Sequence, residues 1–405
     1  SQRDESAPDH IICVVVDALR ADHIDSDTTP YLSGLNHSTA ITPGTWTFPA
    51  VSSLLSGVYP HEHGAMRQTD EFDESDEIRL PPQMDDDRIT ITEALAGAGY
   101  DTYGGFGHDT PFVALSGRFE THELYHTINS DAGDVLGDYF DWVDGREQTF
   151  AFLHLADPHT PVDPPETYRR KYEVDNSIDG LDGWRYETDI ECDTACQQYR
   201  DHRQRLYRAS VDYVDDAISE FGEKLESVFE DPLFMLTADH GEAHWEHVEF
   251  DLEHFDGSGC VDHGGTPYEA VARVPFATNA DWDLQRPLSL IDIPTTLADI
   301  TGVDLEDCSG HSFIGDVPSD RTMLIEGSLS GHEKKAVYRN QSKLIASKGH
   351  GVEFGFSLSD EAVVELPDEE YETIKSALPP WPSESDAETE VSGVVEDRLE
   401  QLGYN

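Results

Sequence analysis

The sequence has few basic residues, and lysine is the scarcest charged type. Lys and Arg together number 26 against 83 Asp and Glu, the formal net charge is -57, and the first lysine is Lys171. The acidic residues are spread along the whole chain. A field of this strength repels nucleic acid and anionic membranes, and self-repulsion disfavours a compact state unless counterions screen it. We therefore expect a halophilic protein that folds in molar salt and has neither a nucleic-acid nor a membrane partner.

Cysteines and long hydrophobic runs are also scarce. The five cysteines are odd in number and show no paired zinc-finger spacing. Cys192 and Cys196 lie four residues apart, which leaves a local metal or disulfide pair open, although we expect an incidental helical spacing. No apolar run approaches the ~18 residues of a membrane span, and the opening "SQRDESAPDH" has no signal-peptide core. These features predict a soluble, cytoplasmic protein, with a removed leader left open.

Short apolar runs alternate with helical patterns. "HIICVVVD" is rich in β-branched residues and ends in Asp17, as expected of a buried parallel strand, and residues 148–156 and "PLFMLTAD" repeat the design. Helical spacing runs from Pro49 to Gly57 and from Gln198 to Phe229. The alternation predicts an α/β fold with a doubly wound, mostly parallel sheet flanked by helices.

The C-terminal part of the chain has a different sequence pattern. "EKKAVYRNQSKLIASKGHG" is typical of two antiparallel strands, and the segment after about Pro380 is acidic and rich in Ser and Glu. We expect a catalytic α/β domain over residues 1–315, a smaller α+β portion over 316–379 and an acidic C-terminal segment over 380–405. Acid-rich residues 68–88 form a polar excursion within the first domain.

Two expected strand ends carry residues that bind metals. Asp17 ends the first strand, and Asp239 with His240 ends a later one. Because carboxyl ends of parallel strands share one sheet edge, where ligands bind, these side chains are candidate ligands of a divalent cation. Thr47, in "GTWTFPAVSSLLSG", stands two residues before Pro49. It fits a helix cap, and it also fits a nucleophile whose hydroxyl is activated by that cation.

Three histidines lie in segments with turn residues rather than on helical faces. His154 and His159 belong to "HLADPHTPVDPP", and His263 belongs to "DHGGTPYE". A single histidine is more often surface or core filler than a ligand contact. These three are candidates for substrate contact because they lie in segments with turn residues. The histidines at 61, 63, 244, 247 and 254 we assign to ordinary structural roles, with a surface cation site left open for the last three.

Five motifs occur in a recognisable order: "VVVDALRADH", "TFPAVSSLLSGVYPHEHG", "HLADPHTPVDPP", "LTADHGE" and "HGGTPYEAVARVP". From His10 to about Pro367 the chain resembles the sulfatases and their relatives in the alkaline phosphatase superfamily. The resemblance implies that Asp17, Thr47, Asp239 and His240 hold a metal and that Thr47 is the nucleophile. It also implies that His159 and His263 contact the anionic group or a second metal, with His154 beside them as a substrate-binding residue.

The departures from that family are informative. True sulfatases carry Cys or Ser at the position of Thr47 and convert it to the aldehyde formylglycine, which threonine cannot yield. The Ser and Arg that follow the proline in the family are Ala50 and Val51 here, and the acid beside Asp17 is Ala18. Fewer oxygen ligands and one imidazole favour zinc or manganese over calcium or magnesium.

We therefore expect a metal-dependent hydrolase of small anionic esters, either phosphate mono- and diesters or phosphonates. Thr47 would attack and form a covalent phospho-threonine, with His159 and His263 as catalytic partners. Two alternatives remain: a sulfuric ester hydrolase acting with unmodified threonine, and a metal-stabilised pseudoenzyme that binds anionic glycans.

Overall fold

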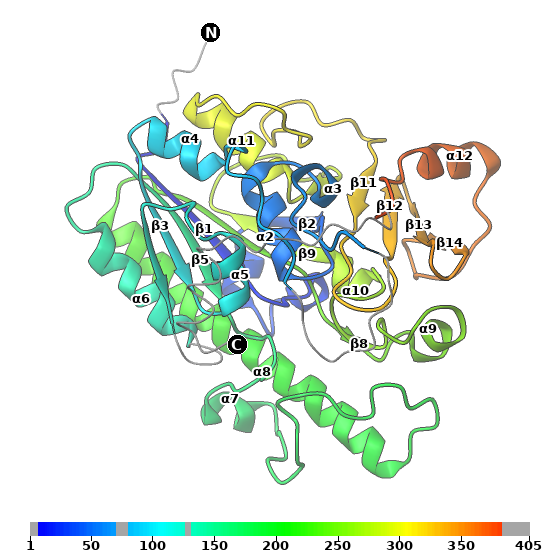
Figure 1. Cartoon of the computed structure of the whole chain (residues 1–405). Coiled ribbons are helices and arrows are strands. Elements are labelled where there is room, and N and C mark those ends of the chain that lie inside the picture. The colour runs from blue at the N-terminus through cyan, green and yellow to red at the C-terminus, as the bar shows by residue number, and fades with distance from the viewer. Residues whose placement is uncertain (1–6, 70–79, 126–130, 383–405) are drawn as a thin grey trace.

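The computed structural model describes residues 7–69, 80–125 and 131–382 (Figure 1). Its centre is an eight-stranded sheet, parallel except for β9, which runs antiparallel to both its neighbours. The strand order is β10 (Leu288–Ser289), β2 (Asn36–Ile41), β9 (Arg273–Thr278), β6 (Leu233–Ala238), β1 (His10–Val16), β5 (Thr149–Leu155), β3 (Asp101–Phe106) and β4 (Thr121–Leu124).

The register of the three central strands brings their carboxyl ends level. Val16 of β1 pairs with Leu155 of β5 on one side and with Ala238 of β6 on the other. All three strands are fully buried along their length, as their apolar, partly β-branched sequences predict. Residues that immediately follow these strands therefore emerge together at one edge.

Helices cover both faces of this sheet, so the doubly wound α/β fold is confirmed (Figure 1). One layer contains α6 (Ala132–Val143) and the long α8 (Thr194–Val228). The other contains α2 (Thr47–Ser56), α4 (Ile91–Gly97), α5 (Asp109–Ala114) and α11 (Asp292–Thr301). Short elements lie in the connections: η1 (Ala21–His23), α1 (Pro30–Gly34), α3 (Pro60–His63), α7 (Glu166–Lys171), β7 (Ala243–His244), α9 (Val248–His254), β8 (Val261–Asp262) and α10 (Glu269–Ala272).

A small antiparallel sheet lies beside the main one, as the sequence predicted for the C-terminal portion. It contains β11 (Met323–Ile325), β12 (Lys335–Arg339), β13 (Ser342–Ser347) and β14 (Val352–Ser357), with α12 (Asp368–Ser376) packed against it. The boundaries of the three expected units remain a prediction. Residues 70–79 of the polar excursion and 383–405 of the acidic end lie outside the described residues.

Three fully buried lysines form ion pairs in and around this small sheet. Lys335 Nζ lies 2.5 Å from Glu326 Oε2, Lys334 Nζ lies 2.6 Å from Asp256 Oδ2, and Lys343 Nζ contacts Glu269 Oε1 at 2.9 Å. The backbone of Glu326 also exchanges hydrogen bonds with the loop before α2, because its N–H donates to Pro43 O and its carbonyl accepts from Thr45 N. The residue that follows β11 of the small sheet thus holds the loop that precedes Thr47.

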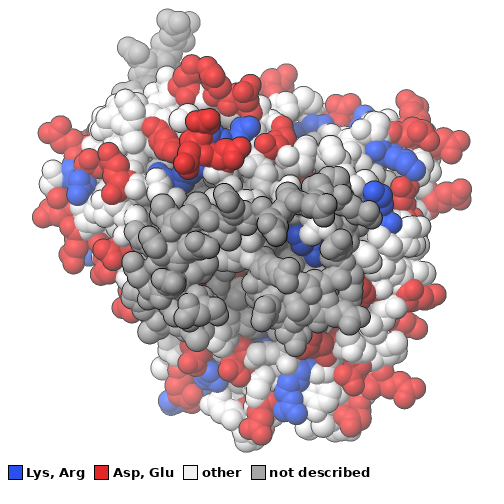
Figure 2. Space-filling view, viewed as in Figure 1, with Lys and Arg blue, Asp and Glu red and all other residues white. Residues whose placement is uncertain are grey.

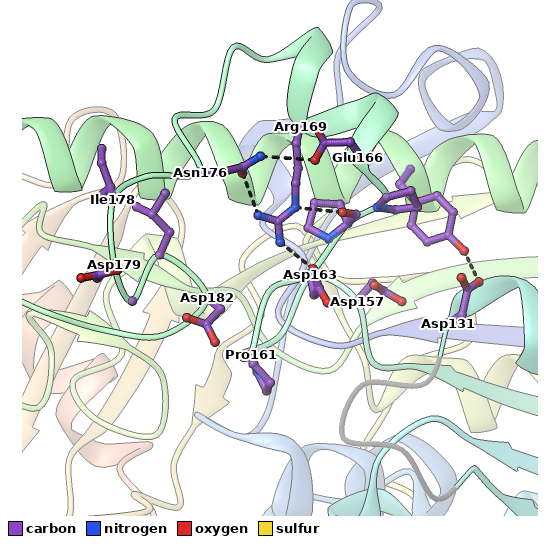
Figure 3. Close-up of a pocket in the computed structure, with 15 residues that line it drawn as sticks. Asp131, Asp157, Pro161, Asp163, Glu166, Arg169, Asn176, Ile178, Asp179 and Asp182 are labelled. Atoms are coloured by element: carbon purple, nitrogen blue, oxygen red, sulfur yellow. Dashed lines mark hydrogen bonds and ion pairs between the residues drawn. The ribbon is translucent and has the colours of Figure 1, made fainter.

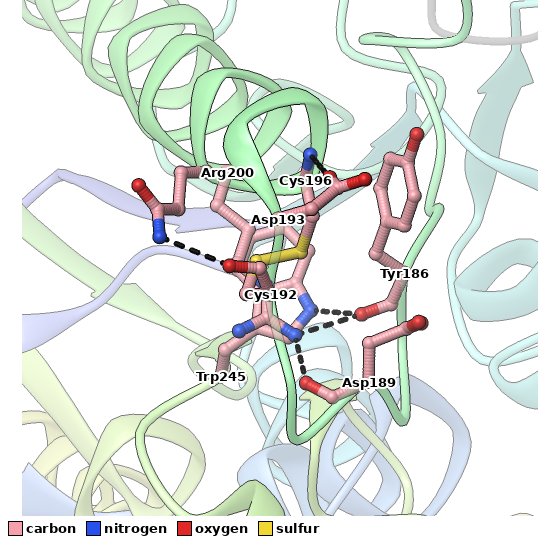
Figure 4. The surroundings of a disulfide bond; sticks show 8 residues. Tyr186, Asp189, Cys192, Asp193, Cys196, Arg200 and Trp245 are labelled. Carbon is pink, nitrogen blue, oxygen red and sulfur yellow. Dashed lines mark hydrogen bonds between the residues drawn. A yellow bond between two sulfur atoms is a disulfide. The ribbon is translucent and has the colours of Figure 1, made fainter.

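Cys192 and Cys196 form a disulfide bond, so the expected incidental spacing was wrong (Figure 4). Helix α8 begins at Thr194, four residues before its predicted start at Gln198. The Asp193 side chain caps this end of the helix by accepting a hydrogen bond from Cys196 N. Cys192 therefore lies just outside the helix, and the two Cα atoms come within 5.2 Å. The neighbouring loop is held by Arg200, whose Nη2 donates to the carbonyls of Tyr186 and Asp189.

The surface is dominated by acidic side chains. Figure 2 shows Asp and Glu spread over the visible face, with few Lys and Arg between them. Among the described residues, no helix is both long and apolar enough to cross a membrane.

Candidate active site

Four polar side chains that the sequence singled out converge at the carboxyl edge of the sheet. Asp17 follows β1, Asp239 and His240 follow β6, and Thr47 is the first residue of α2. Thr47 is not the helix cap, because Trp46 occupies that position and makes no side-chain capping bond. Instead the Thr47 hydroxyl oxygen lies 3.2 Å from His240 Nε2.

The carboxylates and imidazoles lie at distances expected of ligands around one cation. His240 Nε2 is 3.3 Å from Asp17 Oδ1 and 3.7 Å from Asp239 Oδ2. Donor atoms bound at about 2.1 Å in a tetrahedral site lie about 3.4 Å apart, which matches these separations. His154, on β5, brings its Nε2 to 3.4 Å from Asp239 Oδ2 and 3.6 Å from Asp17 Oδ2.

Burial makes these charges costly without a counter-ion. Asp17, His154, Asp239 and His240 are fully buried, and Thr47 is only 3% exposed. Neither carboxylate oxygen of Asp17 accepts a hydrogen bond. Burial opposes ionisation, yet the imidazoles of His159, His240 and His154 hold the pKa of Asp17 well below its usual value. A buried carboxylate that is charged and not hydrogen-bonded fits a metal ligand.

The tautomer of His240 supports the same interpretation. Its Nδ1–H donates to Gly241 O at 2.8 Å, so in the neutral ring the lone pair is on Nε2 and faces Asp17. A lone pair facing a carboxylate is repulsive unless a proton or a metal ion lies between them, and the carboxylates of Asp239 and Asp17 raise the pKa of His240 against the effect of burial. An N–H···O=C bond at the other nitrogen is the usual support of a metal-binding histidine. The buried Asp17, His154 and Asp239 form a group able to hold a metal ion, and their chemistry fits a divalent cation.

Backbone conformation at this edge is unusual at Ala18. Its φ is 60°, a left-handed conformation that few side chains adopt without cost, and its N–H approaches Asp239 Oδ1 at 3.4 Å. Gly241 is required for a different reason, because a Cβ there would lie 2.0 Å from Ala270 O. The turn after His240 therefore packs directly onto the backbone of α10.

His159 and His263 lie next to each other beside this cluster, with ring centroids 5.0 Å apart. His263 also stacks on His240 at 4.0 Å. Burial lowers the pKa of His159 to about 4, whereas the carboxylates of Asp262 and Glu242 overcome burial and raise the pKa of His263 well above its usual value. The two neighbouring imidazoles therefore have pKa values shifted in opposite directions.

Three nearby residues were missed by the sequence interpretation. Glu242 Oε1 and Asp262 Oδ1 lie 3.0 and 2.7 Å from His263 Nδ1, and these residues form a second group able to hold a metal ion. His108 follows β3 and its ring lies 5.1 Å from that of His159. Glu242 lies within "DHGE", and Asp262 precedes His263. Both could have been found in the sequence because they are close to residues that were already candidates.

A mostly parallel sheet with acids and imidazoles collected at its carboxyl edge is the arrangement of the alkaline phosphatase superfamily. Residues 9–303 match the family model described as Sulfatase, and the chain belongs to the sulfatase family. An arylsulfatase of Clostridium perfringens is 26% identical over 226 residues, which cover 49% of this chain and 44% of that protein. The chain thus matches less than half the length of that relative.

Solved structures share the fold. One, a protein in complex with its substrate D-glucosamine-2-N,6-O-disulfate, has a TM-score of 0.68 and 13% identity, covering 99% of both chains. A phosphonate monoester hydrolase from Silicibacter pomeroyi has a TM-score of 0.63 and 16% identity, covering 91% of this chain and 93% of that one.

Proposed function

We propose that the protein is a metal-dependent hydrolase of phosphate mono- or diesters or of phosphonates, with Thr47 as its nucleophile. The observation that carries this proposal is the position of the Thr47 hydroxyl, buried and 3.2 Å from His240 Nε2 at the edge that also holds Asp17 and Asp239. Asp17, Asp239, His240 and Thr47 would hold the cation, with His154 as a further ligand or a contact to substrate. Zinc or manganese suits this mixed oxygen and nitrogen set.

A bound divalent cation would lower the pKa of the Thr47 hydroxyl and neutralise charge on the ester. Thr47 would lose its hydroxyl proton to water, and its Oγ1 would attack phosphorus in line while the bond to the leaving oxygen breaks, which gives a phospho-threonine. His263, whose pKa is raised, would give its proton to that oxygen. His159 donates from Nδ1 to Thr160 O at 2.6 Å, so it would present Nε2 to the transferred group or to the water that later releases phosphate.

Sulfate-ester hydrolysis by the same unmodified threonine is the second candidate. It is favoured by the family itself and by the arylsulfatase relative. Sulfate and phosphate esters share tetrahedral geometry, so the same residues would act in the same roles. The phosphonate monoester hydrolase among the solved structures gives similar support to the first candidate.

Chromogenic substrates separate these candidates. Purified protein in molar KCl with Mn²⁺ or Zn²⁺ is assayed with a phosphate monoester, a phosphate diester, a phosphonate and a sulfate ester. We expect Thr47→Ser to keep measurable activity and Thr47→Ala to lose about a thousandfold or more. Activity that survives Thr47→Ala would reject the threonine mechanism, and an inactive wild type on all four substrates would favour a binding protein.

A further inference from the structure

A large acidic pocket is lined in part by the segment that also carries His159. Its volume is about 870 Å³, and it lies among the segment after β5, helix α7, the loop at 178–182 and the start of α6 (Figure 3). Asp157 on its wall follows His154 by three positions and precedes His159 by two. The backbone that carries candidate catalytic histidines therefore also forms this pocket.

The pocket carries far more negative than positive charge. Six acids line it: Asp131, Asp157, Asp163, Glu166, Asp179 and Asp182. Arg169 is the one basic side chain among the lining residues, and it is already engaged. Its guanidinium donates to Asp163, to Asn176 and to the carbonyl of Pro164, as Figure 3 shows. Glu166 is paired with Arg170, and Asp131 accepts hydrogen bonds from Gly133 N and the Tyr213 hydroxyl. Among the described residues no basic side chain pairs with Asp157, Asp179 or Asp182, so these three carboxylates can attract a positive charge from outside the chain.

Asp157 gives independent evidence for a positively charged ligand. It is 93% buried, since only 7% of it is exposed, and its Oδ2 accepts no hydrogen bond. Burial and the charges of Asp131 and Asp163 raise the pKa of this carboxyl to about 7. A buried carboxyl oxygen without a donor costs free energy that a positively charged ligand would recover.

We propose that this pocket binds an organic ammonium group carried by the alcohol part of the substrate. The inference rests on the proposed function and adds a substrate class to it: esters that carry a cation as well as the reacting anion. A volume of about 870 Å³ suits an organic group rather than a bare ion. A chain of net charge -57 repels a simple anionic ester, and a cationic group on the substrate offsets that repulsion.

Two diesters that differ only in charge test the proposal. One is p-nitrophenylphosphocholine, and the other is its isostere in which a tert-butyl group replaces trimethylammonium. We expect wild type to prefer the ammonium ester by about tenfold in kcat/KM. Asp157→Asn should reduce this preference several-fold, and Asp182→Asn, on the opposite wall, gives a second variant if the first does not fold. Glu223→Gln, an exposed acid on α8 away from the pocket, should keep the preference.

The outcomes separate the two proposals. Equal kcat/KM for both diesters, or a preference unchanged in both pocket variants, overturns the ammonium pocket and leaves the hydrolase intact. If neither diester nor the other esters are hydrolysed, the proposed function fails, and saturation-transfer NMR with tetramethylammonium then decides the pocket. A signal that weakens in Asp157→Asn supports the pocket, whereas no signal, or the same signal in both proteins, overturns it.

Discussion

The Nε2 atom of His240 lies 3.2 Å from the hydroxyl of Thr47 and 3.3 Å from Asp17 Oδ1. One imidazole nitrogen therefore connects the first residue of α2 to the end of the central strand. Three donors of different chemistry therefore lie close together, and their side chains are buried.

Asp17→Asn should abolish stabilisation by metal. A ligand at about 1,000 times its Kd adds about 4 kcal/mol of stability, and the amide removes a charged oxygen from a site with few ligands. Thermal unfolding with EDTA and with added Mn²⁺ or Zn²⁺ measures the gain in each protein. Asp299→Asn, an exposed acid on α11, should keep the full gain. Equal gains in Asp17→Asn and wild type would place the metal elsewhere.

The stability of wild type should fall between about pH 4 and pH 7 relative to Asp157→Asn. The pKa of Asp157 is raised from 3.8 to about 7, so the folded state holds this proton more tightly than the unfolded state does. The tighter binding of this proton makes its full contribution to the free energy of unfolding below pH 4, and that contribution is lost as the pH rises to about 7. The difference corresponds to at most about 4 kcal/mol. Urea unfolding of both proteins across pH 4 to 8 measures it, and parallel curves would contradict the raised pKa.

Lys335→Met should destabilise the protein by about 3 kcal/mol or more, because Glu326 would lose its buried charge partner. Denaturant unfolding in KCl measures the loss. The double variant Lys335→Met, Glu326→Leu removes both charges and should recover part of it. If the double variant is no more stable than the single one, the cost comes from packing rather than from an unpaired carboxylate.

Cys196→Ser should lower stability by about 2 kcal/mol, the loop-closure contribution of so short a ring. The effect should be local, because the bridge closes only residues 192–196, at the start of α8. We expect faster proteolysis near residues 186–193 and an unchanged transition on adding reductant to the variant. Wild type that shows no free-energy change on reduction would mean that the bridge adds nothing to folding.

The sheet and part of the site could be predicted because they depend on local patterns. "HIICVVVD" and "PLFMLTAD" are buried β-branched and apolar runs that end in acids, and parallel strands must bring such ends to one edge. The candidate ligand roles of Asp17 and Asp239 followed from that rule alone.

Other features depend on long-range packing. His154 lies within β5, and its approach to Asp17 depends on which strands are neighbours. Asp262 reaches His263 through a left-handed backbone, with φ of 66°, that no local pattern specified. The acidic pocket is made by four separate segments, and the Cys192–Cys196 bridge depended on where α8 begins. Such contacts are set by tertiary structure.

The use of lysine inside the small sheet has a practical consequence for chemical modification. Of the seven lysines in the sequence, three are enclosed and ion-paired. Amine-directed labels, cross-linkers and resins will therefore react with few lysine side chains. The accessible side-chain amines are those of Lys171, Lys224, Lys348 and Lys375.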